Sequence, residues 1–144
     1  MQERSASATH RGRGLLRGLL AVPLGVAFVV IGIQHFTRPE VFDAIVPSYL
    51  GWPRLWTLSS GALEVLLGLG LCVARARPTS ARLLFWLVVL MSLANINMWW
   101  NDLEFDGMRL NQTEHIIRLC AQLLLLLALA WLSRDKSKRA PEQG

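Results

Sequence analysis

The sequence predicts an all-α membrane protein, a bundle of four transmembrane helices with a short interfacial helix between the first and second. Of its 144 residues, 53% are hydrophobic and only 17% are charged, which is more apolar than is usual for a soluble domain. Four apolar runs are each close to the roughly 20 residues that cross the hydrocarbon core of a bilayer. These runs leave little chain for a separate soluble catalytic module.

The first apolar run is predicted to form a helix over residues 15–36. Arginines precede it, as in a signal peptide, but the run is longer than a signal sequence and ends in Gln34-His35-Phe36 without a small-residue cleavage site. We therefore expect a retained helix. The polar residues 1–14 and 133–144 are predicted to be flexible cytoplasmic tails that flank one domain at 15–132.

The connection at residues 37–54 is predicted to contain a short helix lying at the membrane interface. Pro39 suits a helix start, Phe42, Ile45 and Val46 share one face, and Pro47 ends the segment. Aromatic residues that follow are expected to anchor the chain at the interface: Tyr49, Trp52 and Trp56.

The second and third helices are predicted at residues 55–74 and 81–100. The connection around Pro78 is short, so these helices should be antiparallel neighbours. The fourth helix is predicted at 115–132. Its uninterrupted apolar run of 14 residues is too short to span a bilayer and must extend back through Arg118, with Asn111 and Glu114 as the helix start.

The basic residues predict the orientation. Eleven Lys and Arg residues lie in the two tails, the start of the first helix and the second connection, against three in the other connections. This bias predicts that both termini are cytoplasmic and that the chain is a multi-pass protein of the inner (plasma) membrane. Because the basic clusters border the apolar runs, the net charge of +5 indicates anchoring to the lipid bilayer and not nucleic-acid binding.

Glycines recur on one face of the first two helices. Gly18, Gly25 and Gly32 are seven residues apart, and Gly61 and Gly68 repeat that spacing in the second helix. Small residues in such a stripe let a neighbouring backbone approach closely, so we expect them to mediate helix packing.

Polar groups within the spans predict a pocket. Glu64 lies near the middle of its helix, where a charge costs about 2.5 to 3.5 kcal/mol on insertion scales, so it should be neutral or paired. Arg118, directly or through Gln122 one turn away, is the candidate partner. With Asn95 and His35, these residues are predicted to form either a network that fixes helix register, a ligand pocket open to the outer face, or a path for protons or solutes.

The sequence gives little support for a metal site, a phosphate-binding loop, a catalytic triad or a disulfide. A lone His35 has no second ligand at metal-binding spacing, and no Gly-rich phosphate loop or catalytic triad is recognisable. Cys72 and Cys120 lie in apolar runs without a CxxC motif and are expected to be two buried thiols. We therefore lean against an enzyme with a self-contained catalytic site, with no metal and no evident cofactor.

Four segments together resemble the DoxX family of small bacterial four-helix membrane proteins: GIQHFTRPEVFDAIVPSYL (32–50), SGALEVLLGLGL (60–71), SLANINM (92–98) and RLCAQ (118–122). The family's recurring residues would here be His35, Phe36, Pro39, Pro47, Gly61, Glu64, Asn95, Arg118 and Gln122. The resemblance implies a four-helix bundle and an association with membrane redox chemistry, with quinone as acceptor in some relatives. The chain departs from the redox-active relatives because Cys72 and Cys120 are expected at opposite ends of their helices, beyond the roughly 7 Å reach of a disulfide. The acidic stretch at 101–114 also differs from their Pro-rich connection.

Two functions follow as expectations. In the first, the chain is a DoxX-like protein whose His35, Glu64, Asn95, Arg118 and Gln122 line an outer-facing pocket for a quinone or similar small molecule, in support of a membrane redox partner. In the second, the chain is a structural subunit or assembly factor whose glycine stripes contact another membrane protein or a second copy. A small transporter is a weaker third, since no inverted repeat is visible and dimerisation would be required.

Overall fold

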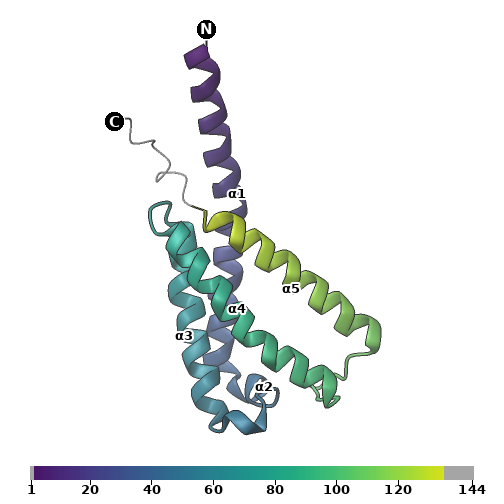
Figure 1. Cartoon of the computed structure of the whole chain (residues 1–144). Coiled ribbons are helices and arrows are strands. Elements are labelled where there is room, and N and C mark those ends of the chain that lie inside the picture. The colour runs from purple at the N-terminus through teal and green to yellow at the C-terminus, as the bar shows by residue number, and fades with distance from the viewer. Residues whose placement is uncertain (1, 135–144) are drawn as a thin grey trace, which may run out of the picture.

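The computed structural model describes residues 2–134 and shows an all-α four-helix bundle (Figure 1). Each long helix contains a segment long and apolar enough to cross a membrane. The elements are α1 (Gln2–Thr37), α2 (Pro39–Asp43), the 3₁₀ turn η1 (Ser48–Leu50), α3 (Pro53–Cys72), α4 (Arg77–Trp100) and α5 (Gln112–Leu132). Numerous large apolar side chains are exposed on the outside of the bundle, which suits contact with lipid rather than with water. The chain is therefore a multi-pass membrane protein.

Helix α1 begins earlier than the sequence predicts. It runs from Gln2, so the segment expected to be a flexible tail continues the membrane-spanning part, Gly14–Thr37, as helix. The apolar span supplies the nucleus, and adding further turns then requires only propagation. The other predicted tail lies outside the described residues from 135 onward.

The predicted interfacial helix is present as α2, with Pro39 in its first turn. After η1, Trp52 adopts a left-handed conformation (φ 45°) immediately before α3 begins at Pro53. Tyr49 and Trp52 are largely exposed beside this turn, as expected of interfacial anchors.

A capping box starts α5, as the sequence predicts. The backbone N–H of Glu114 donates to the Asn111 side chain (3.1 Å), and the backbone N–H of Asn111 donates to the Glu114 carboxylate (2.7 Å). The helix therefore extends back through Arg118, and its 21 residues give about 31 Å of length, enough to span a bilayer.

Helices α1 and α3 cross at their glycines. A Cβ atom added to Gly25 would lie 2.5 Å from the carbonyl oxygen of Gly68, and one added to Gly32 would lie 2.7 Å from that of Gly61. These four glycines lie where the two backbones approach each other closely, so their small size is used within the chain. Gly18 does not take part, because an added Cβ would meet nothing within 4 Å.

All four long helices meet at what we call the terminal end of the bundle, where α5 ends beside α1. The buried core there includes Ala21, Leu71, Leu84 and Leu129, one from each helix. Arg17 of α1 donates hydrogen bonds to the carbonyl oxygens of Trp131 and Arg134, which ties the two ends of the domain to one side.

At the opposite end, which we call the α2 end, the α4–α5 hairpin diverges from the α1–α3 pair (Figure 1). Helix α3 packs against α1 and α4, while α5 packs mainly against α4. The predicted antiparallel arrangement of α3 and α4 is confirmed. The divergence leaves space that α2 and the following turn partly fill.

Candidate functional site

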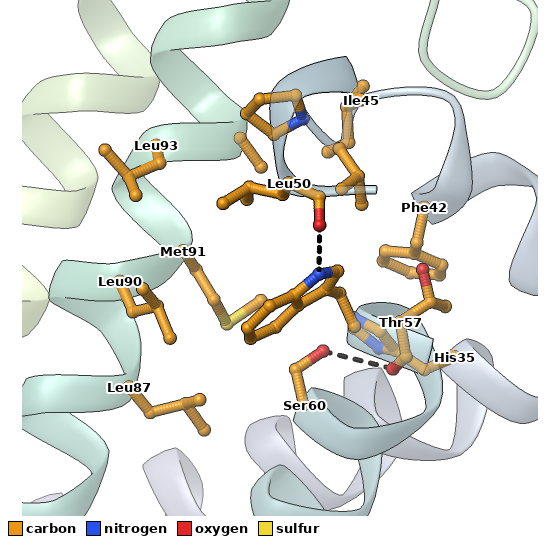
Figure 2. Close-up of a pocket in the computed structure, with 14 residues that line it drawn as sticks. His35, Phe42, Ile45, Leu50, Thr57, Ser60, Leu87, Leu90, Met91 and Leu93 are labelled. Carbon is orange, nitrogen blue, oxygen red and sulfur yellow. Dashed lines mark hydrogen bonds between the residues drawn. The ribbon is translucent and has the colours of Figure 1, made fainter. Parts of the chain in front are cut away.

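A cavity of about 100 Å³ lies at the α2 end, enclosed by α3, α4 and the segment from α2 to η1. Figure 2 shows Leu87, Leu90, Met91 and Leu93 of α4 facing His35, Phe42 and Thr57 across it. Its lining is His35, Phe42, Ile45, Val46, Pro47, Leu50, Trp56, Thr57, Ser60, Leu87, Leu90, Met91, Leu93 and Ala94. The wall formed by α4 is apolar, and the polar groups gather on α1 and α3.

The cavity is partly open at its side. Leu90, Leu93 and Trp56 line it and are also 40–48% exposed on the outside of the bundle. These side chains belong to the spanning parts of α3 and α4, so the opening faces the lipid between the two helices.

Thr57 supplies the most informative polar group. Its side chain is only 2% exposed, and its Oγ1 has no hydrogen-bond partner among the described residues. Ser60, one turn later, donates its hydroxyl to the backbone carbonyl of Thr57 (3.0 Å) and leaves the Thr57 hydroxyl free. A buried hydroxyl without a partner is unfavourable, so this one is available to a bound molecule.

His35 contributes an imidazole with a defined tautomer. Its Nδ1 lies 2.9 Å from the carbonyl oxygen of Ile31. Because a carbonyl oxygen only accepts, Nδ1 must carry a proton, and in the neutral imidazole Nε2 then has a lone pair. His35 is 1% exposed and stacks on Phe42, with ring centroids 3.7 Å apart.

Glu64 lies behind His35, between α1 and α3. Its Oε2 is 3.4 Å from Nδ1 of His35 but accepts no hydrogen bond from the described residues, because the N–H points to Ile31. Glu64 is 2% exposed. A direct Glu64–Arg118 pair, as considered from the sequence, is therefore wrong, since α5 diverges from α3 and His35 takes the place of the arginine.

Among the described residues, a series of aromatic rings connects Arg118 to His35 and so to Glu64. Its guanidinium lies over Phe105 (4.9 Å from the ring centroid), Phe105 meets Phe42 edge to face (5.7 Å), and Phe42 stacks on His35. Residues from α1, α2, the α4–α5 connection and α5 are joined in this way. Cation–π contact satisfies an arginine less completely than a carboxylate would.

Asn95 and Gln122 form a separate cluster between α4 and α5. Asn95 donates to the Gln122 side-chain carbonyl (2.8 Å), and the Gln122 amide donates to Ser92 and to the carbonyl oxygen of Val88 (3.3 Å). The structure therefore does not bring the five residues predicted for a pocket or network together at one place. Of these five, only His35 lines the cavity, with Glu64 adjacent to it.

Ion pairs join the connections at the α2 end. Arg38 pairs with Asp106, and Arg54 donates to Asp43 (2.7 Å). The hydrogen bond from Arg38 to Asp106 and the charge of that carboxylate raise the pKa of the arginine above its ordinary value. Asn97 of α4 donates to the carbonyl oxygen of Ile45 (3.0 Å), which fixes the segment that closes the cavity.

Both cysteines are free, and their positions differ from expectation. Cys72 is half-buried near Gly25, whereas Cys120 is exposed, so the prediction of two buried thiols is wrong for Cys120. Among the described residues, no group of three His, Cys, Asp or Glu side chains could hold a metal ion.

Sequence reasoning missed Thr57, although a signal was present. Thr57, Gly61, Glu64 and Gly68 are four, three and four residues apart and therefore share one helix face, and all four are buried against α1 or the cavity. The apolar wall of α4 carried no comparable signal, because apolar residues occupy most positions of that helix.

Comparisons with known proteins identify the family of the chain and nothing further. No curated protein and no solved structure matches it. Residues 24–134 match the model of a domain of unknown function, DUF8561, which covers the cavity and every element except the beginning of α1. The chain thus belongs to the DUF8561 family.

Proposed function

We propose that this protein binds a small, mainly apolar molecule in the cavity at the α2 end, with a quinone-type ring as the best-fitting class, in support of membrane redox chemistry. The observation that carries the proposal is the unpartnered, buried hydroxyl of Thr57 beside His35, opposite an apolar wall. Ligand sites combine an apolar lining with a few placed polar groups in this way.

The size of the cavity limits what it can hold. Its volume of about 100 Å³ is on the scale of cavities that take a benzene-sized ring and is smaller than the roughly 300–1,000 Å³ of pockets for drug-sized ligands. A single ring would fill it. An apolar tail would leave through the side opening between Trp56 and Leu90 into the lipid.

The resemblance to DoxX proteins supports the same proposal through the order of its motifs along the chain. His35 and Glu64 belong to those motifs and lie in or next to the cavity. Under this proposal the protein resides in a bacterial inner membrane with both termini in the cytoplasm, as the distribution of Lys and Arg favours. The cavity then lies toward the outer face.

The chemistry of electron transfer would come from the bound molecule and a membrane partner, not from a catalytic site of this chain. The rival proposal of a structural subunit loses its main argument, because Gly25, Gly32, Gly61 and Gly68 are occupied by the α1–α3 contact.

Filling the cavity tests the proposal. Ala94 lines it, whereas Ala121 is exposed on α5, so Ala94→Phe and Ala121→Phe make a matched pair. A short-tailed benzoquinone is titrated into each full-length protein in lipid nanodiscs, with tryptophan quenching as the signal. We expect Ala94→Phe to weaken binding at least tenfold and Ala121→Phe to leave it unchanged; equal affinity for both variants would rule the cavity out as the site.

A further inference from the structure

We infer that the molecule bound in this cavity carries a phenol-type hydroxyl group, and that His35, backed by Glu64, accepts the proton of that hydroxyl. The inference rests on the proposed function, because it assigns a chemical class to the ligand of the same cavity. The arrangement that leads to it is a buried carboxylate, an imidazole and a cavity in series.

The first step of the argument is the free nitrogen of His35. The proton on Nδ1 is engaged by the carbonyl oxygen of Ile31, so Nε2 of the neutral imidazole is an acceptor. No hydrogen bond from the described residues reaches Nε2, and His35 lines the cavity. A ligand that satisfies this nitrogen must donate a hydrogen bond, which a hydroxyl does and a ketone oxygen or an ether does not. The reduced, quinol form of a quinone-type ring carries such a hydroxyl, so the inference assigns the quinol as the form that His35 recognises.

Glu64 makes His35 a proton acceptor as well as a hydrogen-bond acceptor. Transfer of the hydroxyl proton breaks the ligand O–H bond, forms an N–H bond at Nε2 and leaves the electron pair on the ligand oxygen as a phenolate. The resulting imidazolium lies 3.4 Å from Oε2 of Glu64. Pairing with it stabilises the ionised form of that buried carboxyl group, because opposite charges attract strongly where water is excluded. This step transfers a proton and no electrons between the ligand and His35, so it requires no oxidant.

Thr57 completes the recognition. Its unpartnered hydroxyl donates to the ligand oxygen or to a second oxygen on the ring. Around His35, α3 contributes Glu64, α2 contributes the uncharged Phe42, and α4 contributes only apolar side chains. Arg118 of α5 is separated from His35 by the rings of Phe105 and Phe42. Glu64 is thus the ionisable group nearest the imidazole.

A matched pair of probes tests this directly. 4-Nitrophenol has a hydroxyl and changes its absorption spectrum on ionisation, and 4-nitroanisole replaces that hydroxyl by a methyl ether. Both are titrated into the full-length protein in nanodiscs of neutral lipid, at a pH at which free nitrophenol is protonated. We expect nitrophenol to bind at least tenfold more tightly than nitroanisole and to show the phenolate band when bound.

Variants assign the proton acceptor. Glu64→Gln keeps the shape of the side chain and removes its ability to ionise, and Glu104→Gln makes the same change in the exposed α4–α5 connection. We expect Glu64→Gln to abolish the phenolate band and to reduce the preference for nitrophenol at least fivefold, with nitroanisole binding unchanged as a check of folding. Glu104→Gln should behave as wild type.

The outcomes separate this inference from the proposed function. If both probes bind with equal affinity and Ala94→Phe abolishes both, the cavity is the site but the hydroxyl preference is wrong. A wild-type phenolate band in Glu64→Gln would overturn the role of Glu64. If neither probe binds to wild type although the benzoquinone does, the inference fails and the proposed function stands; if the benzoquinone does not bind either, both fail. The wild-type spectrum decides the proton transfer even if Glu64→Gln does not fold.

Discussion

At the scale of single residues, the Thr57 hydroxyl should lower the stability of the folded protein and raise its affinity for a ligand. Its hydroxyl is buried without a partner, which penalises the folded protein by about 1–3 kcal/mol. Such a group persists when a bound molecule satisfies it. Glu64 likewise has a buried oxygen, Oε2, that accepts no hydrogen bond, although Nδ1 of His35 lies 3.4 Å from it.

Replacing Thr57 by Val should raise stability and lower affinity together. Valine has nearly the same shape and lacks the hydroxyl, so we expect a stabilisation of up to about 1 kcal/mol and a two- to tenfold loss of quinone affinity, the range of one hydrogen bond. Thermal unfolding and the nanodisc titration measure the two effects. Thr57→Ser retains the hydroxyl and should keep the affinity; a loss of affinity equal to that of Thr57→Val would speak against a hydroxyl contact.

At the scale of helix pairs, the α1–α3 contact depends on glycine because backbone meets backbone. An alanine Cβ at position 25 would lie 2.5 Å from the Gly68 carbonyl oxygen, while one at position 18 would meet nothing. Gly25→Ala should therefore destabilise the protein by about 1–3 kcal/mol. Gly18→Ala is the control and should be neutral or slightly stabilising, as alanine favours helix. Detergent-induced unfolding followed by circular dichroism compares them, and similar midpoints would contradict the crossing.

The α4–α5 pair is held by a polar cluster instead. Asn95, Gln122 and Ser92 bond across the interface, and such bonds between membrane helices average about 0.6 kcal/mol, with a maximum of about 1.7. A double-mutant cycle of Asn95→Leu and Gln122→Leu should give a coupling energy in this range. A coupling near zero would mean that the two side chains do not interact in the folded protein.

At the scale of the whole molecule, periodicity and length were enough to predict the four membrane-spanning segments, but not the extension of α1 back to Gln2. The capping residues Asn111 and Glu114 located the start of α5, and Pro39 that of α2, because both act through local geometry. The site was predicted less well. The positions of Glu64 and Arg118 along their helices allowed an ion pair between them. Depth in the membrane does not indicate which helices are adjacent, however, and in the structure α5 diverges from α3. Only His35, with Glu64 beside it, remained in the site.

Topology is a property of the whole chain and can be measured without a ligand. In a background of Cys72→Ala and Cys120→Ala, Ser48→Cys lies at the α2 end and Thr79→Cys lies in the first turn of α4, both exposed. We expect a membrane-impermeant maleimide to label the former in intact cells and the latter only after permeabilisation, because Lys and Arg are concentrated at the terminal end. The reverse pattern would invert the proposed orientation.

The measurement that tests the central claim most directly is photolabelling of the membrane-embedded protein with a diazirine-bearing benzoquinone, followed by peptide mass spectrometry. The account predicts adducts on residues 42–60 and 87–94, which supply most of the cavity lining, and their loss in Ala94→Phe but not in Ala121→Phe. Adducts confined to the exposed face of α5, or labelling of the cavity segments that survives Ala94→Phe, would contradict it.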